Sequence, residues 1–249
     1  MQFLILSDMH GNAEALSAVL RKVRRKRFDG CIVLGDLVGY GAAPNQVVET
    51  IRSGLPGKKF WRIRGNHDKV VAGIEDGSSF NHAALAAAQW TAQHLTAPNL
   101  QFVRELPQGP LVLSEGFTIC HGSPLDEDQY LLSIFDAWEV FSHYEGDLIF
   151  FGHTHVPSVF VARGTETRVA LLRGTSGSLK LESGVRYLIN PGSIGQPRDR
   201  DPRAAYMTYD STRRIVRWFR VDYPIEKAQQ RILAAELPRL LAERLALGV

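Results

Sequence analysis

The 249-residue sequence predicts a layered α/β fold. Up to Pro157, short apolar runs alternate with helical or loop segments, and each run ends in Gly, Asp, Asn or His. Beyond Pro157, strand-like segments follow one another with only turns between them, which is typical of antiparallel β structure. The first pattern predicts strands joined by helices, and the second adds a β-rich half to the same chain.

The apolar runs are the clearest predicted strands. They consist of aliphatic, β-branched and aromatic residues and stop at a polar or turn-forming motif. In chain order they cover residues 3–6, 31–34, 60–64, 117–120, 148–151 and 186–189. The strands expected in the second half cover residues 158–161, 167–172, 185–190, 205–209 and 215–221.

Helices are predicted between these strands. Residues 13–26 place Leu16, Val19 and Val23 on one apolar stripe, which is the periodicity of an amphipathic helix. Three further helices are expected, one after Pro44, one in an Ala-rich segment and one shorter; they cover residues 45–52, 81–95 and 136–142.

The C-terminal segment 225–247 is predicted to be helical, with Pro238 marking a break or the start of a second helix. Its apolar residues are expected to pack on the core of the same chain. The sequence contains no internal repeat, low-complexity segment or linker. We therefore expect one domain over residues 1–249, with the C-terminal segment packed on it.

Composition excludes several classes of protein. Hydrophobic residues make up 45% and charged residues 22%, and the net charge of +3 is too small to indicate a nucleic-acid binder. No apolar run approaches the roughly 20 residues that span a bilayer, and the N-terminus lacks the features of a signal peptide. Cys31 and Cys120 lie in apolar runs and are expected to be buried free thiols, which fits the cytoplasm.

Residues 21–27, RKVRRKR, form a strongly basic run. The favoured interpretation is the solvent-exposed face and end of the first helix, where cations also suit the helix dipole. A nucleic-acid-binding patch is the alternative, but nothing else in the sequence supports it. We therefore expect neither a nucleic-acid partner nor a membrane.

The stretch DLIFFGHTHVP, residues 147–157, joins a buried strand to two histidines. His153 and His155 are two residues apart, so they point to the same side as long as the chain stays extended. Gly152 before them allows a sharp turn of the backbone. This spacing favours a metal site over a polar loop, and the other strands should supply further ligands.

Five predicted strands end in residues that can bind a metal. In open α/β sheets ligands bind beyond the carboxyl ends of the strands, so we expect these side chains at one edge of the sheet. Seven groups are too many for one tetrahedral ion and suit two ions that share a carboxylate. Imidazole and carboxylate ligands together favour Mn, Fe, Co, Ni or Zn. The seven are Asp8, His10, Asp36, Asn66, His121, His153 and His155.

The motifs SDMHGN, GDLVGYG, RGNHD, CHGS and GHTH occur in this order, each at the end of an apolar run. Together they resemble the five signature blocks of the calcineurin-like metallophosphoesterase superfamily, and in particular its small bacterial and archaeal members. The resemblance covers Asp8 to His155, and the turn at residues 190–193, NPGS, resembles a further family element. It implies a pair of β-sheets sandwiched between helices.

The resemblance also implies roles for the matched residues. Asp36 would bridge two metals, of which Mn is the first expectation, with Fe, Zn, Ni and Co as alternatives. His67 would act as general acid or stabilise charge on the phosphoryl group, and Asp68 would orient His67. One metal would be held by Asp8, His10 and His155, and the other by Asn66, His121 and His153.

Candidate substrate contacts lie close to these motifs. Asn12 and Tyr40 follow ligand-bearing turns, although Asn12 is also suited to cap the helix that begins at Ala13. Arg198 or Arg203 could grip a phosphate through two parallel hydrogen bonds, or form a surface ion pair instead. The helix from residue 81 is expected to cap the site, with Phe80 and Asn81 at the entrance; Asn12, Tyr40 and Arg198 are the substrate-binding candidates.

The expected function is a dinuclear metal-dependent phosphohydrolase, most of all a phosphodiesterase for small phosphodiesters or nucleotides, with a metal-bridging hydroxide as nucleophile. The alternatives are a phosphomonoesterase or protein phosphatase, and a metal-binding scaffold of the same fold without catalysis. His67 and the full ligand set argue against the scaffold. A nuclease that uses the basic run is a further, less favoured alternative.

Overall fold

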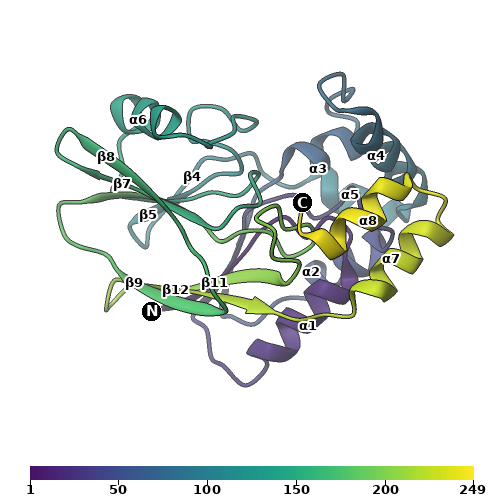
Figure 1. The fold of residues 1–249 in the computed structure, drawn as a ribbon, viewed down its shortest axis with the longest axis horizontal. Coiled ribbons are helices and arrows are strands. Elements are labelled where there is room, and N and C mark those ends of the chain that lie inside the picture. Colours follow the sequence, from purple (N-terminus) through teal and green to yellow (C-terminus); the bar gives the residue numbers. More distant parts are fainter.

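The computed structural model describes residues 1–249 and contains two six-stranded mixed sheets with helices on their outer faces (Figure 1). In the first sheet, two parallel pairings join three N-terminal strands, and the remaining pairings are antiparallel. Its order is β3 (Lys59–Arg62), β2 (Gly30–Val33), β1 (Gln2–Leu6), β11 (Ala204–Asp210), β12 (Ile215–Val221) and β9 (Ser176–Lys180).

The second sheet is built in the same mixed way. Two parallel pairings join β5, β6 and β10, and antiparallel strands complete both edges. Its order is β4 (Leu111–Leu113), β5 (Phe117–Ile119), β6 (Leu148–Phe150), β10 (Arg186–Asn190), β7 (Ser158–Arg163) and β8 (Glu166–Leu171). The expected strand-rich second half is confirmed, while β4 and β9 were not predicted.

Alternating side chains of β1 separate two hydrophobic cores. Phe3 and Ile5 pack in a cluster that joins the facing sides of the two sheets, together with Phe150 and Ile189 of the second sheet. Leu4 and Leu6 point the other way, into the cluster under the helices. A third, smaller cluster joins the second sheet to its own helix. The resulting order of layers, helix–sheet–sheet–helix, confirms the expected fold class.

Helices cover both outer faces of the sandwich (Figure 1). The first helix ends at Val23, three residues earlier than the periodicity predicted. Two helices were not predicted: a short one that begins at Asn66 and one with a proline in its first turn. The helices are α1 (Ala13–Val23), α2 (Pro44–Arg52), α3 (Asn66–Val71), α4 (His82–His94), α5 (Ala97–Arg104), α6 (Ile134–His143), α7 (Ile225–Ala234) and α8 (Arg239–Leu247).

The C-terminal segment forms two helices, α7 and α8, and Pro238 lies at the start of the second. Their residues Ile232, Leu241 and Leu245 belong to the same buried cluster as Leu16 of α1, so the segment packs on the core of its own chain, as expected. None of the helices combines the length and the hydropathy that crossing a membrane requires.

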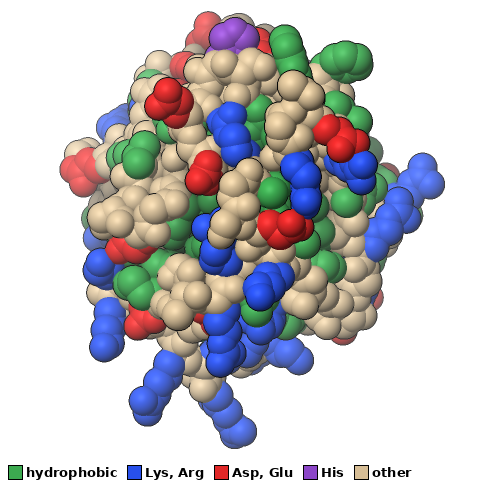
Figure 2. Space-filling view, turned by 90° about the vertical axis from the view of Figure 1, so that its left-hand side faces the viewer, with side chains coloured by type: hydrophobic (Ala, Val, Ile, Leu, Met, Phe, Trp, Pro, Cys, Tyr) green, Lys and Arg blue, Asp and Glu red, His purple; other side chains and the backbone are tan.

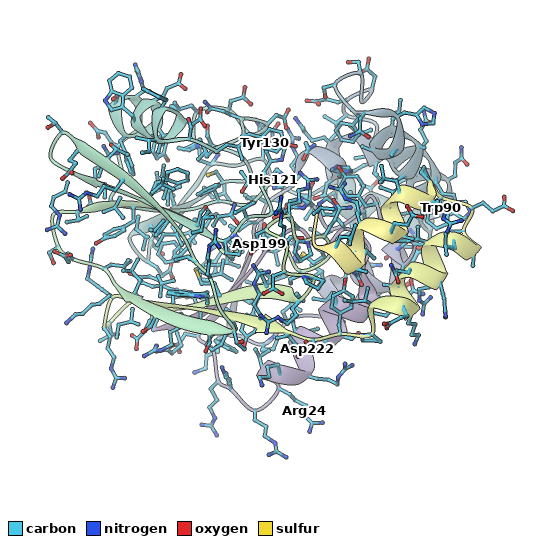
Figure 3. All side chains as sticks on the ribbon, viewed as in Figure 1. Arg24, Trp90, His121, Tyr130, Asp199 and Asp222 are labelled. Carbon is cyan, nitrogen blue, oxygen red and sulfur yellow. The ribbon has the colours of Figure 1, made fainter.

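The basic run at residues 21–27 lies at the end of α1 and in the turn after it, and its side chains are exposed apart from Val23. Figure 2 shows Lys and Arg side chains projecting from the lower edge of the molecule. Figure 3 places Arg24 at that edge, well away from His121 in the middle. The basic run is therefore a solvent-exposed surface outside the site described next.

Candidate metal centre

The predicted ligands come together at the ends of strands from both sheets. Asp8, Asp36 and Asn66 follow β1, β2 and β3 of the first sheet. The histidine ligands of the second sheet follow β5 and β6. The expectation of one sheet edge is therefore wrong in detail, because the carboxyl ends of parallel strands in two packed sheets meet at the same place.

The ligand atoms form two groups that share one carboxylate. The atoms in each group lie within 4.8 Å of one another, and Asp36 belongs to both. Its Oδ2 lies 3.4 Å from Nε2 of His10 and 3.4 Å from Nε2 of His121. Asn66 joins the second group, with its Oδ1 3.2 Å from Nε2 of His121. The groups are Asp8, His10, Asp36 and His155, and Asp36, His121 and His153.

Backbone carbonyls orient the imidazoles. The Nδ1 atoms of three histidines donate to carbonyl oxygens, which directs each Nε2 towards the cluster. His153 is turned the other way: its Nε2 donates to the carbonyl of Asp128 at 3.0 Å and its Nδ1 faces the cluster. The other pairs are His10 with Val38 at 3.1 Å, His121 with Leu34 at 2.7 Å and His155 with Gln196 at 2.6 Å.

The donor set fits a bound cation. The Nε2 atoms of His10 and His155 lie 3.0 Å apart, and both rings already donate through Nδ1. Two lone pairs facing each other at this distance are stabilised by a positive ion beside them. The Oδ2 atoms of Asp8 and Asp36 are buried without a hydrogen-bond partner. Burying an unpaired carboxylate oxygen costs free energy, and a bound cation would offset that cost. Mixed nitrogen and oxygen donors suit transition-metal ions.

The turns that carry the ligands adopt left-handed backbone conformations. Asp8, Asp36, His153 and His155 have φ of 53°, 53°, 64° and 61°, a region that residues other than glycine rarely occupy. Such conformations cost of order 1–3 kcal/mol each and cluster at functional sites. The premise of an extended chain at His153 and His155 was therefore wrong: the backbone turns at both residues, and they belong to different ligand groups.

Two glycines make room for the carboxylates. A Cβ at Gly152 would lie 2.1 Å from the Ser7 hydroxyl oxygen, and one at Gly65 would lie 2.2 Å from Oδ1 of Asp36. Neither glycine has a left-handed φ. Their role is thus the close approach of backbone to a ligand carboxylate, and not the sharp turn that was expected of Gly152.

Burial and mutual charge set the protonation of the cluster. Burial lowers the pKa of His153 to about 3 and the pKa of both His10 and His155 well below the ordinary value, so these rings are neutral and able to bind metal. Burial also lowers the pKa of His121, but the Asp36 carboxylate outweighs it and raises that pKa to about 10. The space between the His121 ring and the Asp36 carboxylate therefore attracts a positive charge, whether a proton or a metal ion.

His67 lies beside the cluster without a polar partner at Nδ1. It is buried, and its ring packs on Tyr40 and Phe80, with ring centroids 4.3 and 4.5 Å away. A Cβ at Gly39 would lie 2.4 Å from Nδ1, so Nε2 is the nitrogen left for a substrate. Burial lowers the pKa of His67 to about 4, and the negative charge of a bound phosphoryl group would raise it.

Asp68 supports the site through backbone contacts. Its Oδ1 accepts from the amides of Leu37 and Val38 at 3.0 and 3.2 Å, and its Oδ2 accepts from Gly65 at 3.0 Å. Both carboxylate oxygens are thus occupied, and neither contacts the His67 ring. Asp68 fixes the loop under the ring, because its position in the first turn of α3 directs it to unpaired amides. The orientation of His67 by Asp68 stays a prediction, and it would act through this loop.

The predicted substrate contacts differ in outcome. Asn12 caps α1, accepting from Ala15 at 3.0 Å and donating to the carbonyl of Gly195 at 2.9 Å. The capping alternative is therefore confirmed, and a contact of Asn12 with a substrate stays a prediction. Arg203 is held in an ion pair with Asp201 at 2.7 Å.

Tyr40 and Arg198 do lie at the site. The Tyr40 ring packs on His10 with centroids 4.7 Å apart. Arg198 is half-buried and donates from Nη2 to the Tyr40 hydroxyl at 3.3 Å. These two residues therefore remain candidates for contact with a substrate.

A cleft of about 200 Å³ gives access to the second ligand group. Its lining includes Asn66, His67 and His153, together with Phe80 and Asn81 at the start of α4, as expected. The aromatic side chains of Tyr40, Phe80 and Tyr130 form part of its walls. Tyr130 was not predicted: its ring stacks on His153 at 3.8 Å, but it comes from a loop without a recognisable motif.

The NPGS turn supports the ligand loops. The Asn190 side-chain amide donates to the carbonyl of Gly152 at 2.6 Å and to the Thr154 hydroxyl at 3.0 Å. The Ser193 hydroxyl donates to the carbonyl of Asp8 at 2.8 Å. The turn thus binds the loops after β1 and β6, one from each sheet, and fixes their relative position.

Comparison with known sequences agrees with this geometry. The profile of the calcineurin-like phosphoesterase superfamily domain matches residues 1–213. An uncharacterized protein of Methanocaldococcus jannaschii is 38% identical over 251 residues, which cover 98% of this chain and 97% of that protein. The chain therefore belongs to the calcineurin-like phosphoesterase superfamily.

Solved structures lead to the same class of protein. A metallophosphoesterase from Sphaerobacter thermophilus has 37% identity and a TM-score of 0.84, with 100% of this chain and 99% of that chain covered. A hypothetical protein from Pyrococcus horikoshii shares the fold at 21% identity, with a TM-score of 0.81 and coverage of 100% and 98%. Family and fold together identify the chain as a phosphoesterase, as the sequence predicted.

Proposed function

We propose that the protein is a dinuclear metal-dependent phosphodiesterase that acts on small phosphodiesters or nucleotides. The observation that carries this proposal is the shared carboxylate: Oδ2 of Asp36 is buried, free of hydrogen bonds and equidistant from an imidazole of each ligand group. A carboxylate in that position suits the bridge between two ions. Two metal ions, when bound, would activate the attacking water and offset negative charge on the phosphoryl oxygens.

We propose the following metal ligands. Asp8, His10 and His155 would bind one ion, Asn66, His121 and His153 the other, and Asp36 both. The buried, neutral imidazoles of His10, His153 and His155 and the free carboxylate oxygens support this assignment. Mixed imidazole and carboxylate donors favour Mn²⁺, with Fe, Zn, Ni and Co ions as alternatives.

His67 is the proposed acid or charge-stabilising group. Its Nε2 is available to the cleft, next to Asn66 of the second ligand group. The anionic phosphoryl group would raise the pKa of His67, and the protonated ring would then donate its proton to the leaving oxygen. The Tyr40 and Phe80 rings pack against the imidazole, which restricts the donor to one orientation.

The cleft favours substrates with an organic group on the phosphate. Aromatic side chains of Tyr40, Phe80 and Tyr130 line it beside His67, and apolar walls of this kind bind carbon-rich parts of a ligand. We also propose that residues 1–249 act as one domain, because α7 and α8 share the core of the sandwich. The two buried free thiols support the cytoplasm as the compartment.

The test is hydrolysis of bis-p-nitrophenyl phosphate and of p-nitrophenyl phosphate by metal-stripped protein, with Mn²⁺, Zn²⁺, Ni²⁺ or Mg²⁺ added in turn. We expect metal-dependent turnover that is faster with the diester. Faster turnover of the monoester would favour a phosphomonoesterase instead. The absence of turnover with every metal, in protein shown by elemental analysis to bind two ions, would favour a scaffold without catalysis.

A further inference from the structure

Two arginines lie beside the Tyr40 ring at the edge of the metal centre. The guanidinium carbon of Arg198 is 5.9 Å from the centre of the Tyr40 ring, and that of Arg244 is 6.0 Å from it. The same ring lies 4.7 Å from the ring of His10 and 4.3 Å from that of His67. Both positive charges are therefore one aromatic side chain away from the proposed catalytic groups.

Neither arginine makes an ion pair with an aspartate or glutamate. Arg198 donates from Nη2 to the Tyr40 hydroxyl and to Oε1 of Gln196, both at 3.3 Å, and its Nε is buried without a partner. Arg244 donates from Nε to a main-chain oxygen of Val249, which in this structure is the last residue, so this oxygen belongs to a carboxylate. Most of the hydrogen-bond donors of both guanidinium groups thus remain available to a ligand.

Neighbouring arginines of the same region are paired with carboxylates. Arg203 lies 2.7 Å from Asp201, and Arg220 pairs with Asp199. Asp199 and Asp201 therefore neutralise the charges of Arg220 and Arg203. Arg198, their neighbour in the chain, has no carboxylate partner.

The last helix brings Arg244 to this position. The C-terminal end of α8 points to the middle of the molecule (Figure 1), and the amide of Arg200 donates to the carbonyl of Gly248 at 2.8 Å. Figure 3 shows Asp199, the neighbour of Arg198 in the chain, close to that end of α8. Arg244 lies beyond residues 1–213, which match the family profile.

Space for a ligand adjoins Arg198. Arg198 also lines an open cleft of about 550 Å³, together with Arg173 and Arg200. The side chains of these two arginines make no ion pair either, so the cleft carries an excess of positive charge. Burial and then the charge of Arg198 lower the pKa of Arg244, which means that the two cations repel each other. A bound anion would relieve that repulsion.

We propose that Arg198 and Arg244 form a subsite for a second phosphate group of the substrate, one that is not itself hydrolysed. Planar guanidinium groups with free donors bind phosphate through pairs of charge-assisted hydrogen bonds. The preferred substrates are then phosphoesters with at least two phosphate groups, such as nucleoside diphosphates or bisphosphates. This inference rests on the phosphodiesterase activity proposed above and narrows its substrate class.

The experiment measures competitive inhibition of bis-p-nitrophenyl phosphate hydrolysis by adenosine 5′-monophosphate, adenosine diphosphate and adenosine 3′,5′-bisphosphate. The three share the base and the ribose, and the last two place the second phosphate at different distances. We expect at least one of them to inhibit the Mn²⁺-loaded enzyme roughly tenfold to a hundredfold more strongly than the monophosphate, because hydrogen bonds to charged groups have this strength.

Variants test the assignment. Arg244→Gln should reduce that preference to about twofold or less, as should Arg198→Gln, while Arg244→Lys should retain part of it. Arg239→Gln is the matched control, because Arg239 is an exposed residue of α8 paired with Glu243, and it should keep the full preference. Thermal unfolding of each variant verifies that it is folded.

Equal inhibition by all three nucleotides, or a preference retained in both glutamine variants, would overturn the subsite. An enzyme that hydrolyses neither p-nitrophenyl ester with any metal would overturn the proposed function instead. In that case calorimetric titration of the metal-loaded protein with the same nucleotides decides the subsite separately. Tighter binding of a two-phosphate nucleotide that is lost in Arg244→Gln would still support it.

Discussion

Replacing Lys69 with methionine tests a buried charge network that supports the metal centre. Lys69 lies in α3 and is only 1% exposed. Its Nζ contacts Asp128 at 2.6 Å, Glu75 at 2.7 Å and Glu127 at 3.2 Å. Asp128 in turn accepts from His153 through its backbone carbonyl. Lys69→Met keeps the length of the side chain and removes the cation that holds these carboxylates together.

The expected loss of stability follows from the exposure of the partners. Removing one member of a fully buried ion pair costs about 3–5 kcal/mol. Here Asp128 and Glu75 are 43% and 46% exposed, so water screens them after the substitution. Glu127 keeps Arg64 at 2.9 Å. We therefore expect a decrease in the free energy of unfolding of about 2 kcal/mol, which for a chain of this length lowers Tm by about 4–8 °C.

Thermal unfolding followed by circular dichroism measures this difference, in metal-stripped protein so that metal binding adds nothing. The control is Arg163→Met, whose ion pair with Glu182 is 60% and 57% exposed and should contribute little. The control should change Tm by less than about 2 °C. A Tm of Lys69→Met that lies within about 1 °C of the unsubstituted protein would refute the idea that this network stabilises the fold.

Three further predictions concern the metals, the acid and the thiols. Asp36→Asn removes the charge shared by both ligand groups, so elemental analysis should show metal content falling from about two ions per chain to below one; unchanged content would exclude the bridge. His67→Ala should retain metal but hydrolyse bis-p-nitrophenyl phosphate about 10²–10⁴-fold more slowly; loss of metal would make His67 a ligand. Burial raises the pKa of the Cys31 and Cys120 thiols, so dithionitrobenzoate should react only slowly with the native protein. After unfolding it should react readily with both thiols. Rapid reaction of the native protein would contradict their burial.

Local sequence was sufficient for most of the strands and for the chemistry of the ligands. An apolar run that stops at Asp, Asn or His predicts both where a strand ends and which ligand residue follows it, as at Asp8 and Asp36. Helices were harder to predict when short. The helix from Asn66 begins inside a ligand motif, where the residues that bind metal obscure the pattern of a helix.

The positions of side chains within the site depended on contacts across the chain. Asn12 was ambiguous between a helix cap and a substrate contact, and its hydrogen bond to Ala15 confirms the cap. Asp68 was expected to orient His67, yet its hydrogen bonds run to backbone amides. In each case the side chain also bonds to a partner distant in sequence, Gly195 for Asn12 and Leu37 for Asp68, which no local pattern predicts.

The sequence by itself determined the fold class, the ligand types and the phosphoesterase family, because these depend on residue type, order and spacing along the strands. The family resemblance assigned His153 and His155 to different metals. Only the tertiary structure showed the backbone that does this, since left-handed turns replace the extended chain there. It also brought Arg244 of the last helix beside Arg198 and Tyr40. Contacts between residues so far apart in the sequence depend on how the sheets, turns and terminal helices pack, and no local sequence pattern encodes that packing.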